Sequence, residues 1–322
     1  MSASDTATRT KLRVAVFGVG AVGGVFGARL AQAGHDVWFI ARGATRDALR
    51  ANGLRLDSVD GDLHLEQVQV TDDPSQVGPV DVVLVGVKAT QVTGVAPSMR
   101  ALLGPNTVVI PLQNGVEASV RLADALGAEH VLEGLCRVIA AQAGPGHIRH
   151  PAVTPVLEFG ARQGSTLPEA TAAMIPVVAD AMRGAGINTL VPADMTTALW
   201  EKFLFIEPIG VVGAASHQPY GTVRSVPETR ALTDQAIEEV IAVGRAVGVQ
   251  WPADAKEQIW KRYDSLPPNE FTSMARDLIA ERPSEFDAQT SAVVRLARQR
   301  GVSTPVHDVL HALLLPNVVA TN

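Results

Sequence analysis

The stretch Gly18-Val19-Gly20-Ala21-Val22-Gly23 directly follows the apolar run Val14-Ala15-Val16-Phe17 and opens a segment with helical spacing that ends near Gly34. Glycines at the first, third and sixth positions of such a turn permit a tight bend, a close approach of the backbone to a pyrophosphate, and close packing of helix on strand. Amide groups of the first helical turn then face the phosphates. The stretch therefore predicts a dinucleotide-binding unit; the alternative is a purely structural turn.

The end of the second expected strand, Asp36–Ile40, distinguishes between the two nicotinamide dinucleotides. NAD-binding sites usually carry an acid there, which accepts a hydrogen bond from the ribose 2′-hydroxyl. Here the strand runs through Ala41 into Arg42 with no acid in place. A guanidinium pairs with a 2′-phosphate in a bidentate geometry. The sequence therefore predicts NADPH as the cofactor and Arg42 as a contact to it; the alternative is a solvated loop arginine.

Outward from this unit, short apolar runs rich in β-branched residues alternate with helical spacing, which predicts a parallel sheet covered by helices. The expected strands are Arg13–Gly18, Asp36–Ile40, Val80–Val87, Thr107–Leu112, Val131–Leu135 and, after a Gly-Pro-Gly turn, Thr154–Phe159. The expected helices between them are Ala21–Ala33 and Gln91–Leu103.

From about Leu167 onward the spacing becomes helical, with glycine and proline between the segments. The expected helices are Pro168–Gly184, Thr196–Ser216, Glu228–Val247, Ala253–Tyr263, Thr272–Ala280, Ser284–Arg300 and Val306–Leu314. We therefore predict an α/β protein with two domains: a Rossmann-type parallel sheet domain that binds NADPH at 1–192, and an all-helical domain that binds substrate and carries the catalytic groups at 193–322.

Composition narrows the class of protein. A chain of 322 residues suits two domains, and its net charge of −6, without a basic block, gives no reason to expect a nucleic-acid partner. No apolar run reaches the roughly 18 residues of a membrane span, and the polar segment 1–10 does not resemble a signal peptide. The single cysteine, Cys136, excludes an intrachain disulfide and a multi-cysteine metal site. We expect a cytoplasmic protein without a metal centre.

Several motifs, in this order, resemble the ketopantoate reductase (2-dehydropantoate 2-reductase) family over nearly the whole chain. They are the glycine turn with Arg42, Lys88-Ala89-Thr90-Gln91, Gln113-Asn114-Gly115, Trp200-Glu201-Lys202, Ser273-Met274 and Arg282-Pro283-Ser284-Glu285-Phe286-Asp287. The resemblance implies reduction of a 2-oxo acid by NADPH, 2-dehydropantoate to pantoate, in pantothenate and coenzyme A synthesis. It also implies that Lys202 is the general acid, that Glu285 and Ser273 contact the substrate, and that Glu285 tunes the lysine.

Elementary chemistry supports two of these placements. Lys88 and Asn114 follow the carboxyl ends of expected parallel strands, where open α/β sheets bind ligands. A lysine there can neutralise a carboxylate or phosphate, and an asparagine can hydrogen-bond a nicotinamide ribose or a substrate oxygen. We therefore assign both to cofactor and substrate binding. The alternatives are a solvated lysine and an ordinary Asn-Gly turn.

Lys202 lies in the strongly apolar stretch Trp200–Gly213, where a charge is costly unless it is paired. Hydride addition to a carbonyl places negative charge on oxygen, which a cationic donor both stabilises and protonates. The alternative is that Lys202 reaches solvent along its stem. For Glu285 the alternative is a first-turn acid of a helix capped by Ser284, and for Ser273 it is a local cap.

The histidines are given no catalytic role. His35, His147 and His150 lie in turn-like stretches, and we expect them to be solvated.

The chain departs from the family pattern after the lysine. The family usually carries asparagines four and eight residues later, where this chain has Ile206 and Gly210. Because such positions share a helix face, we expect both to face the substrate, with Gly210 adding space, and Pro208 to kink the helix.

Three functions therefore compete. The first is reduction of 2-dehydropantoate, the second is reduction of a bulkier or more apolar carbonyl or imine, and the third is NADPH sensing without turnover. We expect a small-molecule partner, with a homodimer as the assembly to be tested.

Overall fold

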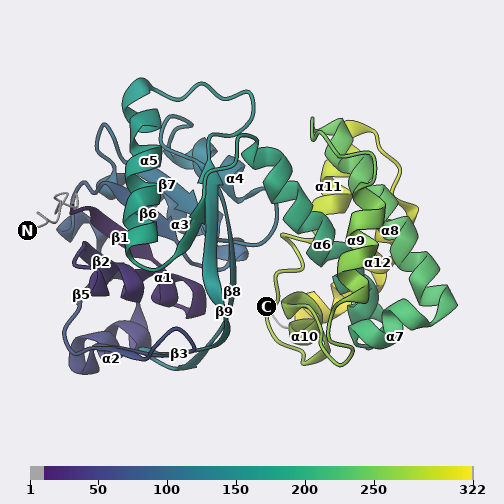
Figure 1. Ribbon diagram of the computed structural model, residues 1–322, viewed down its shortest axis with the longest axis horizontal. Helices are drawn as coiled ribbons and strands as arrows, with labels where there is room; N and C mark the ends of the chain where they lie inside the picture. The colour runs from purple at the N-terminus through teal and green to yellow at the C-terminus, as the bar shows by residue number, and fades with distance from the viewer. Residues whose placement is uncertain (1–10, 321–322) are drawn as a thin grey trace, which may run out of the picture. The chain divides into compact units, whose positions relative to one another are not determined.

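A computed structural model of the chain describes residues 11–320, except for the side chains of 319 and 320. Segment 1–10, for which the sequence predicts no signal peptide, lies outside the described residues. The chain divides into two compact units (Figure 1). The sheet unit is Met1–Gln113 with Ala118–Met195, and the helical unit is Asn114–Glu117 with Thr196–Asn322. The chain thus leaves the sheet unit at Asn114, contributes four residues to the helical unit, and re-enters the sheet unit after Glu117.

The sheet unit is built on a five-stranded parallel sheet. Its strands are β1 (Arg13–Phe17), β2 (Asp36–Ile40), β5 (Gln69–Thr71), β6 (Val82–Val85) and β7 (Val108–Pro111). They lie in the order β5-β2-β1-β6-β7. In the register of β1, Val14 pairs with Val37 on one side and with Val82 on the other. The winding reverses between β1 and β6, which is where open parallel sheets bind ligands at their carboxyl edge.

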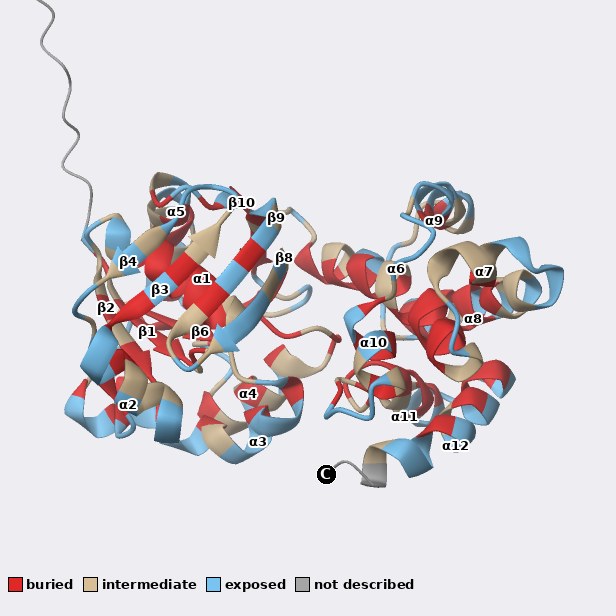
Figure 2. Ribbon diagram, turned by 90° about the horizontal axis from the view of Figure 1, so that it is seen from below, coloured by how far each residue is buried: buried red, intermediate tan, exposed pale blue. Residues whose placement is uncertain are grey.

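Helices cover both faces of this sheet, which explains why β1 and β6 are almost wholly apolar and buried. On one face, α1 (Ala21–Gln32) packs between the parallel sheet and a second sheet of order β10-β9-β3-β4. The other face is covered by α3 (Val92–Val95), a 3₁₀ segment η3 (Ala96–Leu102) and α4 (Ala118–Leu126). Figure 2 shows the buried α1 beneath the alternating residues of β3 and β9.

The second sheet contains three short strands and one long hairpin. Its strands are β3 (Leu54–Ser58), β4 (Leu63–Leu65), β8 (Glu133–Gly144), β9 (His147–Gly160) and β10 (Asn188–Leu190). The hairpin β8-β9 is antiparallel and irregular in register. Two more helices complete the unit: α2 (Gly43–Asn52) after β2, and α5 (Glu169–Gly184) before β10.

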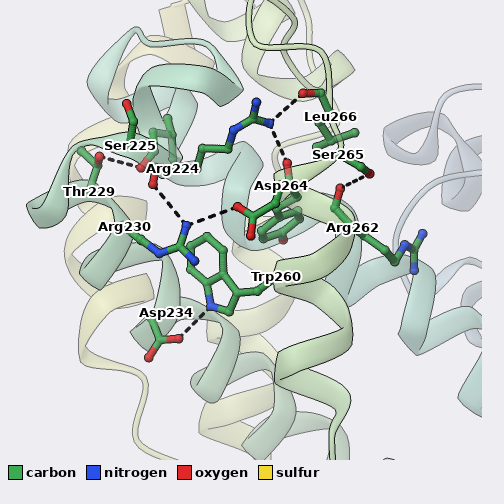
Figure 3. A network of polar contacts seen from close by, with 12 residues as sticks. Arg224, Ser225, Thr229, Arg230, Asp234, Trp260, Arg262, Asp264, Ser265 and Leu266 are labelled. Atoms are coloured by element: carbon green, nitrogen blue, oxygen red, sulfur yellow. Dashed lines mark hydrogen bonds and ion pairs between the residues drawn. The ribbon is translucent and has the colours of Figure 1, made fainter.

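Among its described residues, the helical unit contains seven helices. They are α6 (Met195–Ser216), α7 (Tyr220–Ser225), α8 (Pro227–Ala246), α9 (Ala255–Asp264), α10 (Ser273–Ile279), α11 (Thr290–Arg300) and α12 (Pro305–Ala320). Helix α8 packs against α7, α11 and α12. Figure 3 shows how α8 and α9 are joined: the Arg230 guanidinium lies 3.9 Å from the centre of the Trp260 ring, whose Nε1 donates to Asp234.

The predicted fold class, a parallel sheet domain followed by a helical region, is confirmed. None of the described helices is long and apolar enough to cross a membrane.

Two predicted elements of the sheet unit are wrong in detail. Gln91–Leu103 is not one helix but α3 continued by 3₁₀ turns. Pro97 has no amide hydrogen to donate, and Gly94 has a low helix propensity, so a long α-helix is disfavoured here. Val131–Leu135 is not a strand of the parallel sheet. Val131 only bridges to Val109, and the chain then enters β8 of the second sheet, which the sequence pattern did not predict.

Candidate active site

A cavity of about 640 Å³ lies in the sheet unit, at the carboxyl ends of β1, β2, β5 and β6. Its wall includes five of the predicted site residues: Gly18, Val19, Gly20, Arg42 and Lys88. Three others, Ala21, Val22 and Gly23, form the first turn of α1 and do not line the cavity. The cavity thus opens where the strand order reverses, at the carboxyl ends of the neighbouring strands β1 and β6.

The three glycines of the turn have different physical tasks. Gly18 has φ +98°, and a Cβ there would lie 2.6 Å from the amide nitrogen of Val87. A Cβ at Gly23 would lie 2.1 Å from the carbonyl oxygen of Gly18, so any side chain would separate helix from strand. At Gly20, in contrast, no described atom lies within 4 Å of the Cβ position. The backbone at Gly20 is therefore open to a ligand, as a diphosphate cradle requires.

The cavity is lined by one positive and one negative side chain near the ends of β2 and β5, Arg42 and Asp72. Arg42 is exposed and precedes α2, and among the described residues its side chain makes no capping hydrogen bond. Asp72 also lines the cavity, but its carboxylate is paired with the guanidinium of Arg46. Arg46 is held in place by a second contact of 2.8 Å to Asp47. The negative charge of Asp72 is thus compensated by Arg46, whereas the positive charge of Arg42 is exposed at the cavity wall, where it could attract an anion.

Two glutamines of the motifs order the strand ends beside the cavity. The Gln91 side chain accepts a hydrogen bond from the backbone amide of Lys88 (3.2 Å). Nε2 of Gln113 donates to the carbonyl oxygens of Val85 and Val87, at 2.7 and 2.8 Å. Both glutamines therefore act on the turn that presents Lys88. The sequence motifs contain them, but periodicity alone does not reveal this task.

In the helical unit, two predicted site residues are in direct contact. Nδ2 of Asn114 donates to Oε2 of Glu285 at 2.7 Å. The following Gly115 has φ +96°, and a Cβ there would lie 2.4 Å from the carbonyl oxygen of Ala288. Glu117 forms an ion pair with Arg295 on α11. Asn114 is therefore more than a turn residue, because the segment that carries it is fastened to the segment that carries Glu285.

Lys202 lies on α6 and is only 8% exposed. Its neighbour Trp200 makes edge-on ring contacts with Phe203 and Trp251, so the start of α6 is packed by aromatic rings. This burial contradicts the alternative of a lysine that extends into solvent.

Ser273 is exposed and begins α10. It is not the cap of that helix, because the hydroxyl of Thr272 accepts the amide hydrogen bond of Ala275 (3.1 Å). The hydroxyl of Ser273 is therefore not needed to cap the start of α10.

Three further expectations are corrected by the structure. The helix predicted to start at Ser284 starts at Thr290, and 284–289 forms turns. Phe286 is fully buried there, and its carbonyl accepts the amide of Ser291. Consequently Ser284 caps no helix, and Glu285 is not a first-turn acid. His150 is 1% exposed rather than solvated, since its ring nitrogens contact the Ser58 hydroxyl and the Val153 carbonyl.

The third correction concerns Gly210, which does not add open space. A Cβ there would lie 2.9 Å from the hydroxyl oxygen of Thr272. The space that a side chain at this position would occupy is taken by the cap of α10. Ile206, the other departure, is half-buried.

Comparisons with known proteins identify the family to which the chain belongs. The model for ketopantoate reductase PanE/ApbA matches residues 14–164, and the model for its C-terminal part matches 194–317. A 2-dehydropantoate 2-reductase of Mycobacterium tuberculosis is 31% identical over 304 residues, which is 94% of this chain and 96% of the relative. The chain belongs to the ketopantoate reductase family.

Solved structures agree with this family. A PanE/ApbA family ketopantoate reductase from Ralstonia eutropha is 32% identical, covers 96% of this chain and 99% of its own, and superimposes with a TM-score of 0.83. A D-mandelate dehydrogenase in complex with NADH has a TM-score of 0.82 at 20% identity, covering 96% of this chain and all of its own. The second likeness is one of fold alone. As a member of the ketopantoate reductase family, the chain is an oxidoreductase.

Proposed function

We propose that this ketopantoate reductase family member reduces a 2-oxo acid with NADPH, and that Lys202 is the general acid. The first candidate substrate is 2-dehydropantoate, because relatives of 30% and 31% identity are named for it. The observation that carries the proposal is the burial of Lys202 at 8% exposure in an apolar helix, which costs free energy that a role in catalysis would justify. A protein that only senses NADPH has no use for such a group.

The sheet unit would hold the cofactor as a Rossmann-type domain does. The open backbone at Gly20 fits a diphosphate, and the exposed guanidinium of Arg42 fits a 2′-phosphate. Asp72 would repel that phosphate, but its pairing with Arg46 removes most of the repulsion. Lys88 adds a positive charge for a phosphate or for the carboxylate of the acid. When bound, NADPH supplies the hydride.

The helical unit would supply the proton and orient the substrate. Reduction of a ketone places negative charge on its oxygen, to which Nζ of Lys202 donates a hydrogen bond and then a proton. Glu285 stabilises the cationic form of the lysine, and Asn114 fixes the orientation of the Glu285 carboxylate through the 2.7 Å contact. The exposed hydroxyl of Ser273 donates to a substrate oxygen.

A second candidate substrate is a bulkier or more apolar carbonyl or imine. It is favoured by Ile206, which cannot hydrogen-bond, and by the absence of any side chain at Gly210, whose place is filled by Thr272. Two amides that would recognise a polar acid are therefore missing from α6. A site that lacks such groups discriminates weakly between substrates.

The proposal is tested by following oxidation of NADPH and NADH with 2-dehydropantoate and with apolar 2-oxo acids and imines of similar size. We expect turnover with NADPH in preference to NADH, and a higher kcat/KM for a 2-oxo acid than for an imine. A higher kcat/KM for the apolar compounds selects the second candidate. Tight NADPH binding without turnover of any compound in the set refutes the enzymatic proposal.

A further inference from the structure

The centre of the helical unit contains a fully buried cluster of charged side chains. Nε2 of His307 on α12 lies 2.7 Å from Oε2 of Glu207 on α6, and its Nδ1 lies 2.6 Å from Oε2 of Glu239 on α8. The side chains of His307 and Glu207 have no exposed surface, and that of Glu239 is 9% exposed. Burial of charges is costly, and such clusters are kept where they fix one packing arrangement.

The imidazole is protonated in this cluster, since both ring nitrogens can donate only in the cationic form. Burial by itself lowers the pKa of His307, but the charge and hydrogen bond of Glu207, followed by those of Glu239, outweigh it and raise the pKa to about 9. Glu239 also accepts the backbone amides of Val306 and His307 at the start of α12. These contacts hold α6, α8 and α12 together around one cation.

Thr290 joins this cluster to the candidate catalytic segments. Its hydroxyl donates to Oε1 of Glu207 (2.9 Å) and lies 3.8 Å from the sulfur of Met274, the residue after Ser273. Thr290 is fully buried and begins α11, directly after the turns that carry Glu285. Glu207 follows Lys202 on α6. The three segments that carry Lys202, Ser273 and Glu285 therefore meet at one hydroxyl group.

We propose that Thr290 and Glu207 are positioning residues, which hold the helix bearing Lys202 in register with the segments bearing Ser273 and Glu285. The role in catalysis rests on the proposed function, whereas the mechanical coupling of the segments does not. His307 acts with them, because its ring contacts both carboxylates and holds that of Glu207 in place. None of the three touches the reacting atoms in this proposal.

The experiment compares Thr290→Val, which keeps the shape and removes the hydroxyl, with Thr290→Ser, which keeps the hydroxyl. The matched control is Thr233→Val, since Thr233 is also fully buried in the helical unit but bonds only within its own helix, to Thr229. We measure kcat and KM for the 2-oxo acid, the Kd of NADPH, and amide hydrogen exchange in peptides that cover 199–207 and 284–289.

Thr290→Val is expected to lower kcat about 10- to 100-fold, the scale of a small misplacement of a catalytic group, and to leave the Kd of NADPH unchanged. Exchange should become faster in both peptides. Thr290→Ser should restore kcat and slow exchange, and Thr233→Val should change neither. Glu207→Gln should resemble Thr290→Val, with an altered pH profile of kcat.

A normal kcat in Thr290→Val, with an active unmodified protein, overturns the positioning role. If the unmodified protein turns over no 2-oxo acid, the proposed function fails, and hydrogen exchange alone then decides the coupling. Faster exchange in both peptides supports it, and faster exchange in one or neither refutes it.

Discussion

The hydroxyl of Tyr263 donates a 3.1 Å hydrogen bond to the carbonyl oxygen of Leu204, the acceptor that Pro208 cannot serve. In a regular helix this carbonyl would accept the amide four residues later, and proline has none. Tyr263 lies on α9 and is fully buried. The interruption of α6 between Lys202 and its C-terminal half is therefore compensated by a side chain from another helix.

This relationship predicts a coupled loss of stability. Tyr263→Phe should reduce the free energy of unfolding by about 1 to 3 kcal/mol, because it leaves a buried carbonyl without a donor. Pro208→Ala restores the backbone donor, so Tyr263→Phe should cost less in that background. Urea unfolding of the four proteins gives the coupling energy. Additive effects of the two substitutions would show that the tyrosine does not serve this carbonyl.

Arg42→Ala should weaken NADPH much more than NADH. A charge-assisted contact contributes about 1.5 to 3 kcal/mol, so KM for NADPH should rise roughly 10- to 150-fold. The control is Arg50→Ala, an exposed arginine in the last turn of the same helix, α2, that does not line the cavity. Equal use of both cofactors by the unmodified protein would contradict the prediction before any substitution is made.

Lys202→Met removes the charge and keeps the length of the side chain. We expect kcat to fall about 100-fold or more, the usual scale for a general acid, with little change in NADPH binding. Lys261→Met, an exposed lysine on α9, should behave as the unmodified protein. Steady-state kinetics and NADPH titration measure both. Normal turnover in Lys202→Met would remove the lysine from the mechanism.

The two departures from the family pattern, Ile206 and Gly210, differ in how tightly they are packed, so substitutions at them should have different effects. Ile206→Asn should be tolerated, because the site is half-buried, and should raise kcat/KM for 2-dehydropantoate. Gly210→Asn should lower the melting temperature, because its Cβ would press on the hydroxyl of Thr272 and overpacking costs about 1 to 3 kcal/mol. Thr272→Ala should reduce this penalty. Unchanged melting of Gly210→Asn would show that α10 gives way freely.

Stability should depend on pH through His307. Its pKa in the folded protein, about 9, lies above the ordinary 6.5, so protonation favours the folded state. The contribution is complete below about pH 6.5 and is lost as the pH rises through 9. Urea unfolding between these values should show a decline that His307→Gln abolishes and His64→Gln, at an exposed position, retains. A decline that survives in His307→Gln would have to come from other groups.

The parts of the fold that follow from local pattern were predicted well. The glycine turn, β1 and α1 are encoded within about 20 consecutive residues by strand, turn and helix signals. The strand ends that carry Arg42 and Lys88 then follow from parallel topology, since such ends share one edge of the sheet. Hairpin β8-β9 was predicted only in part: the Gly-Pro-Gly turn joins its strands, and the expected strand Thr154–Phe159 lies within β9. The rest was missed because both strands are long, half exposed and irregular in register, so they lack regular alternation.

Contacts between distant residues had no local signal. Asn114 and Glu285 are 171 residues apart, and the family motifs identify each of them but not their hydrogen bond. Glu207 and His307 are 100 residues apart. The one available hint was Glu207 itself, an acid within the apolar stretch of α6, because a charge there needs a partner. Gly210 was misjudged because a sequence does not show which neighbour fills the space beside a glycine.

The excursion of Asn114–Glu117 into the helical unit has a consequence for recombination between family members. A single crossover near residue 195 would transfer the helices of one parent but keep the four-residue segment of the other. Arg295 and Glu285 would then meet a foreign segment in place of Glu117 and Asn114. Chimeras should contain an intact helical unit only when segment Asn114–Glu117 and the helices after residue 195 come from the same parent. The unit that must be exchanged as a whole is therefore encoded by two separate parts of the gene.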